Sequence, residues 1–104
     1  MMMLVLERNG NLLHLYSSAA DAESNLEVID IENAEYEFCD TSGQRFVAEI
    51  INPVTKLRSG SFRLKPEGKP DRSVVASFIL RTQTLDRSCD GVKTLTDLKK
   101  LAGL

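Results

Sequence analysis

Four carboxylates that lie close together in the sequence are the first candidates for chemistry. Asp30, Glu32, Glu35 and Glu37 fall within eight residues. Alternate residues of a strand point to the same side about 7 Å apart, so Glu35 and Glu37 form a pair if this stretch is extended. Paired carboxylates bind hard cations or exchange protons with a substrate, but cation sites usually draw their acids from several elements. The commonest use of the pattern is a solvated sheet face. The functional alternative that we carry forward is an acidic surface that binds a basic partner, formed by these four residues.

The other reactive side chains do not assemble into a known catalytic set. His14 is the only histidine, and it shares its strand face with Leu12 and Tyr16, which favours a structural role. Cys39 is expected on the outward side of its strand, with no second histidine or cysteine nearby to activate its thiol. Cys39, Cys89 and His14 are too few for a tetrahedral zinc site. We therefore predict no catalytic residue, no metal site and no cofactor.

Nucleotide and nucleic-acid signals are weak. The six glycines are scattered, so no phosphate-binding loop is present, and no G-x-S-x-G nucleophile motif occurs. A basic segment contains Lys56, Arg58, Arg63, Lys65, Lys69 and Arg72. Such a segment can bind phosphates, but its one aromatic residue, Phe62, is predicted to face inward and offers no base a stacking surface. We predict that the protein does not bind nucleic acid.

Length and composition describe a single ordinary domain. The chain has 104 residues, of which 42% are hydrophobic and 27% charged, and its net charge is -2. No apolar run is long enough to span a bilayer, and no basic leader precedes the first apolar residues. Two cysteines do not form a disulfide framework. These features predict a cytoplasmic protein that does not associate with membranes.

Charge is divided unevenly along the chain. Residues 1–51 carry ten acidic and two basic side chains, whereas residues 52–104 carry five acidic and eleven basic ones. The simpler interpretation is that acidic and basic strands lie side by side and neutralise each other. The alternative is a two-faced molecule that pairs with a charged partner or with itself.

A central hairpin has to position the carboxylates. Residues 35–38 alternate polar and apolar, residues 40–43 form a turn, and residues 44–51 resume the extended pattern. A three-residue loop that ends at Gly43 pairs Phe38 with Phe46 and Tyr36 with Ala48, which buries the same side of both strands.

The remaining elements follow from their periodicity and end signals. We predict strands at residues 2–7 and 11–16, joined by a two-residue Asn9-Gly10 turn, and a strand at 61–65. A short helix spans residues 19–26 and starts at a Ser18/Asp21 capping box, and residues 28–31 are extended. Residues 72–85 show helical spacing after an Asp71 cap, although their β-branched content leaves a strand open. A last helix begins at Thr94 and presents Leu95, Leu98 and Leu101 to the core.

These elements predict an α+β fold. It is a single domain over residues 1–104, with an antiparallel sheet of about five strands and three helices in the order β-β-α-β-β-β-α-α. Residues 1–65 form the sheet-rich part and residues 71–104 the helical C-terminal part. The predicted hydrophobic core includes Ile29.

Residues 26–43, LEVIDIENAEYEFCDTSG, resemble a segment found in small bacterial proteins of unassigned activity. In those proteins an alanine-rich helix leads into I-D-[VI]-E-N-G-E-Y-E, followed by an aspartate and a glycine turn. Ala34 stands where these sequences often have glycine. The resemblance covers about residues 12–50 and implies a bacterial source, but it carries over no catalytic residue.

The sequence therefore favours a small protein-interaction module without catalysis. The most specific form of this hypothesis, by analogy of size and charge, is an immunity-type inhibitor of a toxin. One alternative is a small enzyme or ligand-binding domain with a pocket between the sheet and the helix predicted at 72–85. Another is a homodimeric structural protein joined through an edge strand or the last helix.

Overall fold

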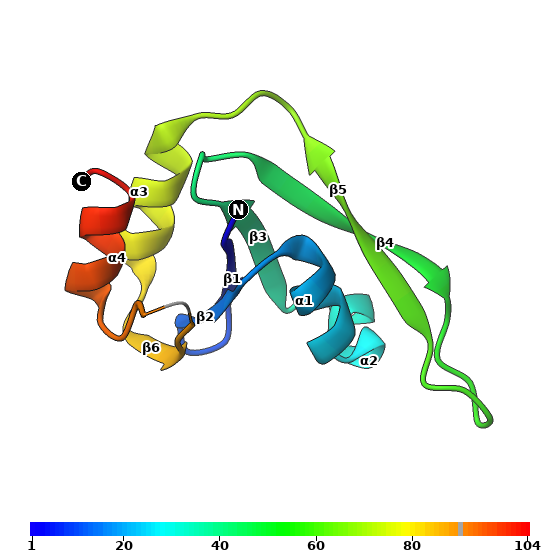
Figure 1. Cartoon of the computed structure of the whole chain (residues 1–104). Helices are drawn as coiled ribbons and strands as arrows, with labels where there is room; N and C mark the ends of the chain where they lie inside the picture. The colour runs from blue at the N-terminus through cyan, green and yellow to red at the C-terminus, as the bar shows by residue number, and fades with distance from the viewer. Residues whose placement is uncertain (90) are drawn as a thin grey trace.

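The strands of this protein form one mixed sheet, and β1 (Met3–Glu7) lies inside it. The computed structural model describes residues 1–89 and 91–104. Across these residues the chain is one α+β domain with six strands and four helices, in the strand order β5-β4-β3-β1-β2-β6 (Figure 1). The other strands are β2 (Leu12–Tyr16), β3 (Tyr36–Asp40), β4 (Arg45–Asn52), β5 (Ser61–Glu67) and β6 (Thr84–Arg87). The helices are α1 (Ala19–Asn25), α2 (Val28–Glu32), α3 (Arg72–Arg81) and α4 (Leu95–Leu101).

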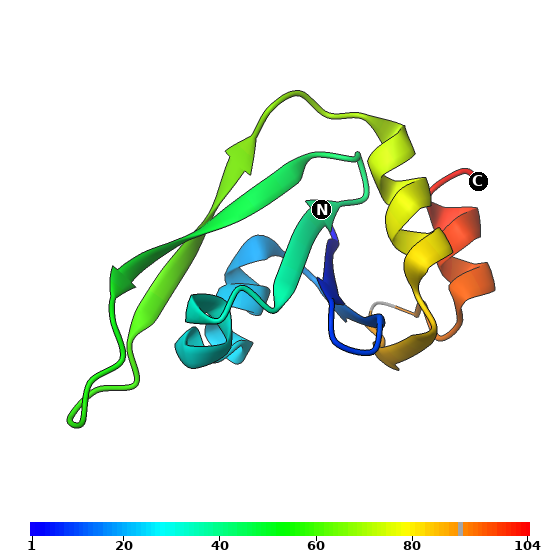
Figure 2. The same cartoon turned by 180° about the vertical axis from the view of Figure 1, so that it is seen from behind.

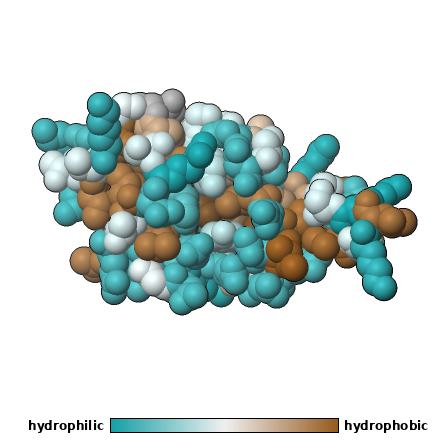
Figure 3. Space-filling view, turned by 90° about the horizontal axis from the view of Figure 1, so that it is seen from below, coloured by the Kyte–Doolittle hydropathy of each residue, from teal (hydrophilic) through white to brown (hydrophobic). Residues whose placement is uncertain are grey.

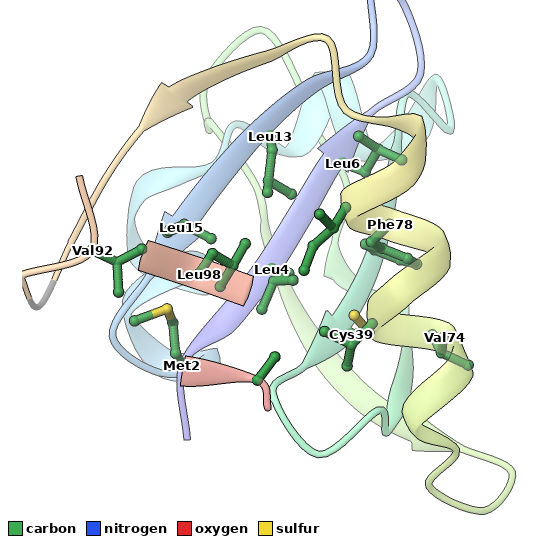
Figure 4. Close-up of a cluster of buried hydrophobic side chains, with 13 residues drawn as sticks. Met2, Leu4, Leu6, Leu13, Leu15, Cys39, Val74, Phe78, Val92 and Leu98 are labelled. Carbon is green, nitrogen blue, oxygen red and sulfur yellow. The ribbon is translucent and has the colours of Figure 1, made fainter. Parts of the chain in front are cut away.

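Both faces of β1 are covered, which explains why its sequence is apolar without alternation. Leu4 and Leu6 point toward α3 and α4 and pack in the same cluster as Phe78 (Figure 4). Met3 and Val5 point to the opposite face and pack in a second cluster with residues of α1 and α2. Figures 1 and 2 show these two helix pairs on either side of the sheet. The fold therefore has two hydrophobic cores that lie on opposite faces of β1, β2 and β3.

The predicted central hairpin is confirmed at its closed end. Phe38 pairs with Phe46 in an antiparallel register. The Asp40 carboxylate accepts hydrogen bonds from the backbone N–H groups of Ser42 (2.9 Å) and Gln44 (3.1 Å). This arrangement lets an aspartate side chain stabilise a turn through its own downstream backbone.

Gly43 connects this turn to α3. Its φ is +86°, and its carbonyl accepts a hydrogen bond from the Asp71 N–H (3.2 Å). A Cβ at this position would lie 2.0 Å from the Asp71 carbonyl oxygen, so only glycine permits the contact. The Asp71 carboxylate accepts a hydrogen bond from the Ser73 N–H (2.9 Å), which confirms the predicted helix cap.

The predicted extended segment at residues 28–31 is wrong, because these residues begin α2. Val28 is buried, and Ile31 packs partly against the same core, whereas Ile29 is 49% exposed. The inward positions are three residues apart, which is the spacing of a helix face. Placing Ile29 in the core was therefore also wrong.

The predicted helix at residues 72–85 ends at Arg81, and β6 follows it. The Gln83 N–H donates to the Asn11 carbonyl (2.9 Å), which starts a parallel pairing of β6 with β2. Leu85 still packs against the core, but from a strand. The predicted class is confirmed, whereas the antiparallel sheet of five strands with three helices is corrected to a mixed sheet of six strands with four helices in the described residues.

Two smaller corrections concern a turn and a helix face. Glu7 pairs with Leu12, which is the register that the predicted Asn9-Gly10 turn gives, but the ladder ends at that pair and residues 8–11 form a four-residue loop. Positive φ values occur at Gly10 (91°) and Asn11 (53°). In α4 the predicted capping box at Thr94 is present, but Leu101 is 55% exposed and does not reach the core.

Strands β4 and β5 form an arm that extends from the body of the domain (Figure 1). Figure 3 shows hydrophobic atoms exposed at the far end of this arm, where Leu57 is 94% exposed. The outer edge of β5 is partly closed, because the Glu23 carboxylate of α1 accepts a hydrogen bond from the Leu64 N–H (2.7 Å). No helix in the described ranges has the length and apolar character needed to cross a membrane.

Candidate functional site

An open groove lies where β3 and β4 separate. The described register between these strands contains two pairs, Phe38 with Phe46 and Cys39 with Arg45. The predicted pairing of Tyr36 with Ala48 is wrong. Tyr36 and Glu37 remain in β3 and pair with β1, but they do not pair with β4, so the two strands diverge within β3. The side of β4 that faces β3 is therefore left open beyond Phe46.

The groove has a volume of about 520 Å³ and two chemically different sides. Apolar or aromatic side chains from α2, β3 and β4 line one side: Ile31, Tyr36, Phe38, Phe46, Ala48 and Ile50. The rest of the lining also contains Ala34 and the partly exposed Val47, and its charged side chains are Arg8, Glu32, Glu37, Arg45 and Glu67. This separation follows from strand alternation, because successive side chains of β3 and β4 point to opposite faces of the sheet.

Backbone groups of β4 also face the groove. The Asp40 N–H donates to the Gln44 carbonyl (3.0 Å), which fixes the alternation of the β3–β4 ladder. By that alternation Phe46, Ala48 and Ile50 direct their N–H and C=O groups toward β3, away from β5. Pro66, which has no N–H, stands opposite Phe46 on β5 and agrees with this assignment. The register with β3 ends at Phe46, so the next two residues of the series, Ala48 and Ile50, pair with β5 but with no described strand on the β3 side.

Glu37 lies at the centre of an arginine cluster beside the groove. Arg81 donates to both carboxylate oxygens, at 2.7 and 3.2 Å, while Arg8 and Arg45 lie 3.6 and 4.0 Å away. The hydrogen bond from Arg81 outweighs partial burial and lowers the pKa of the Glu37 carboxyl below its ordinary value. The guanidinium groups of Arg45 and Arg81 lie 5.9 and 5.3 Å from the Phe78 ring centroid. One carboxylate is thus surrounded by three cations.

The four carboxylates predicted from the sequence do not form one row. Glu37 belongs to the arginine cluster, and Glu32 accepts a hydrogen bond from the Val54 N–H (3.2 Å). Asp30 and Glu35 lie near Tyr36, where burial first and then these and other negative charges raise the pKa of the phenol. The row is divided because residues 28–32 are helical and only Glu37 lies on a strand.

His14 and Cys39 lie in separate environments. The His14 ring packs edge-on against Tyr36, with Nδ1 3.5 Å from the Asp86 carboxylate and Nε2 3.8 Å from Glu7. Cys39 is fully buried in the core beneath α3, so its predicted outward position is wrong. Burial raises the pKa of its thiol to about 12, which leaves it protonated at neutral pH.

Three groove residues were not singled out from the sequence. Arg8 is brought to the site by a loop, where its N–H donates to the Glu35 carbonyl (2.8 Å). Arg45 and Ala48 belong to the recognised hairpin, but the open edge of β4 is visible only when the strands are seen to separate. No residue pattern in β3 or β4 marks the point at which the two strands separate.

Two further observations concern metal ligands and the space beneath α3. In the part of the chain that the structure describes, no three His, Cys, Asp or Glu side chains are placed to hold a metal ion. The ligand-binding alternative predicts a pocket between the sheet and α3. Buried side chains that include Leu4, Leu6 and Phe78 fill this space. No family model matches the chain, and no match is found among curated proteins or solved structures.

Proposed function

We propose that this protein is a non-catalytic protein-interaction module whose contact surface is centred on the groove between β3 and β4. The observation that carries the proposal is an open, two-sided groove with apolar side chains, unpaired strand backbone and exposed arginines. Such a surface combines the apolar contact and the polar groups at the rim that protein interfaces use. An immunity-type inhibitor of a toxin is one form that such a module can take.

The acidic residues remain part of the proposal as a second contact region. Asp30 and Glu35 lie near Tyr36, which lines the groove, so a basic partner residue can reach them beside the groove. Glu37 already accepts a hydrogen bond from Arg81, and Glu32 accepts one from the Val54 N–H. We therefore assign these two residues a structural role in the walls of the groove.

Affinity capture followed by reconstitution tests the proposal. Wild-type protein and three variants are used as bait, and each captured protein is then purified and titrated against the chain by calorimetry. The groove variant is Ala48→Gln, the acidic variant is Asp30→Lys/Glu35→Lys, and the matched control is Glu49→Gln on the arm. We expect one protein to bind wild type and the control equally and to bind the groove variant at least tenfold more weakly.

A captured protein that binds all four forms with the same affinity would contradict the assignment of the site. A purified chain that turns over a small-molecule substrate would contradict the non-catalytic proposal itself.

Self-association is a second candidate, favoured by leucines exposed on α3 and at the C-terminus. Leu80 is 87% exposed, and Leu104 is 55% exposed. They line an apolar cleft of about 410 Å³ together with Ile79 and Leu95. Sedimentation velocity of wild type and Leu80→Glu decides this candidate, because a dimer joined here would dissociate in the variant.

A further inference from the structure

The open edge of β4 is a ready template for another strand. The N–H and C=O groups of Ala48 and Ile50 point into the groove, and the register with β3 ends before them. Unpaired groups of this kind accept an extended segment, whose main-chain hydrogen bonds supply affinity. Tyr36 and Glu37 of β3 pair with β1 and not with β4, so this chain does not fill the position itself.

The outer edges of the sheet are less accessible. On β5, Leu64 donates its N–H to the Glu23 carboxylate (2.7 Å), and Pro66 has no N–H to offer. Carboxylate capping and proline both prevent a sheet edge from pairing with another chain. The opposite edge strand, β6, spans four residues. The edge left open in the groove is therefore the one suited to strand addition.

The two sides of the groove specify the side chains of the added strand. An extended segment alternates its side chains between two faces. On one face they would meet Phe38, Ala48 and Ile50 and must be apolar to displace water favourably. On the other face they would meet Arg8 and Arg45.

The charged face favours an acidic residue in the segment. Arg8, Arg45 and Arg81 surround Glu37, and Glu67 is the second carboxylate in the lining at this end. On this face three cations meet two anions, while the third carboxylate of the lining, Glu32, lies on α2 and accepts a hydrogen bond from the Val54 N–H. The side chains of Arg8 and Arg45 are 57% and 46% exposed and make long contacts with Glu37, and Arg8 also donates to the Ala34 carbonyl (3.2 Å). Both side chains retain donors that can bind a new carboxylate.

We infer that the groove binds one extended segment of a partner protein, which adds to β4 as an antiparallel strand and places an aspartate or glutamate against Arg8 and Arg45. The inference rests on the proposed interaction function and names the chemistry of its partner. A different protein supplies the segment, because the long edge strand of this chain, β5, is blocked by Glu23 and Pro66 and a second copy cannot offer it.

Synthetic peptides of about nine residues test the inference. In each peptide pool, valine, isoleucine, leucine or phenylalanine alternates with threonine, and one aspartate replaces a central threonine. The pools are titrated into isotopically labelled full-length protein, and amide resonances are followed by NMR. We expect saturable shifts at the amides of Ala48 and Ile50. N-methylation of the peptide amides that face β4 should weaken binding about tenfold or more.

Protein variants separate backbone pairing from charge. Arg8→Gln should remove the preference for aspartate over lysine in the peptide, whereas the exposed Arg63→Gln is the matched control and should preserve it. Ala48→Pro removes a donor that points into the groove without removing a hydrogen bond to β5, so it should abolish binding. The N-methylated peptides give the same answer on the wild-type chain if the proline variant does not fold.

Three results would overturn the inference. Equal binding of N-methylated peptides would mean docking by side chains, which leaves the interaction function standing without strand addition. Absence of binding by every pool at millimolar concentration would exclude this segment chemistry, while the capture experiment judges the function separately. Concentration-dependent shifts of Ala48 and Ile50 without peptide would identify a second copy as the occupant.

Discussion

Neutralising Glu37 tests whether the arginine cluster holds β3 and α3 together. Its carboxylate accepts two hydrogen bonds from Arg81, lies close to two further arginines and is 19% exposed. Hydrogen bonds to a charged group contribute about 1.5–3 kcal/mol, and a glutamine can keep only one such bond. We expect Glu37→Gln to lower the free energy of unfolding by about 2 kcal/mol, which is roughly 10 °C in Tm for a domain of this size.

The same variant makes a pH prediction. Because the Arg81 hydrogen bond lowers the pKa of Glu37 in the folded protein, the unfolded chain binds this proton more readily. The stabilisation is therefore complete above the ordinary value of 4.5 and is lost as pH falls through the lower folded value. The difference between wild type and Glu37→Gln should be largest at pH 7 and should shrink steadily below about pH 4.5.

Urea unfolding at pH 7 and pH 3, followed by circular dichroism, measures both effects. Glu49→Gln is the matched control, because Glu49 forms an ion pair with Lys65 in which both side chains are about half exposed. An exposed pair contributes about 0.2–1 kcal/mol, so the control should change little. Equal losses of unfolding free energy in the two variants would refute the conclusion that Glu37 holds β3 and α3 together. A loss for Glu37→Gln that is the same at both pH values would refute it as well.

Three further predictions concern the backbone and the core. Ala34→Gly should raise stability by about 0.5–1 kcal/mol in thermal unfolding, because glycine relieves the φ of 55°. Asn11→Gly is the control and should gain less, since asparagine tolerates that region. Gly43→Ala should prevent folding or cost more than about 3 kcal/mol, because its Cβ would overlap backbone before α3. The control Gly68→Ala meets no atom within 4 Å and should cost only about 1 kcal/mol in the same urea titration. Cys39 should resist alkylation at pH 8 until urea unfolds the chain, as measured by mass spectrometry of its peptide; rapid native labelling would contradict its burial.

Local signals predicted the parts of the fold that depend on neighbouring residues. The pairing of Phe38 with Phe46, the Asp71 cap and the Thr94 capping box all follow from a few consecutive side chains. Their geometry needs no distant contact, which is why the sequence was sufficient.

Features that depend on distant segments were not predicted. Cys39 lies on the same strand face as Glu37, which predicts that it points outward. Helix α3 covers that face and buries Cys39. Residues 82–87 pair with β2, whose residues lie about 70 positions earlier in the chain. Alternation identifies the two faces of a strand but does not say whether one or both are buried.

The candidate site was predicted only in part. The type and position of Glu37 indicate a contact residue, but its arginine partners come from a loop, β4 and α3. The groove exists because two strands stop pairing, and no residue pattern in β3 or β4 records that event. Tyr36 and Glu37 remain in β3 and pair with β1, so the separation arises where β4 leaves β3 and not where β3 ends.

The division into two cores around β1 gives the molecule a hierarchy of local stability. Amides of β1, which pairs with β2 and β3, should exchange with deuterium only on global unfolding. The arm of β4 and β5 joins the rest of the sheet through two residue pairs of β3. Phe62 and Leu64 of β5 are buried in the second core, so opening of the arm should also expose that core. The amides of the arm should therefore exchange faster than those of β1, while the first core remains intact. A segment bound in the groove would connect the arm to the body, so binding would be detected as slower exchange throughout the arm.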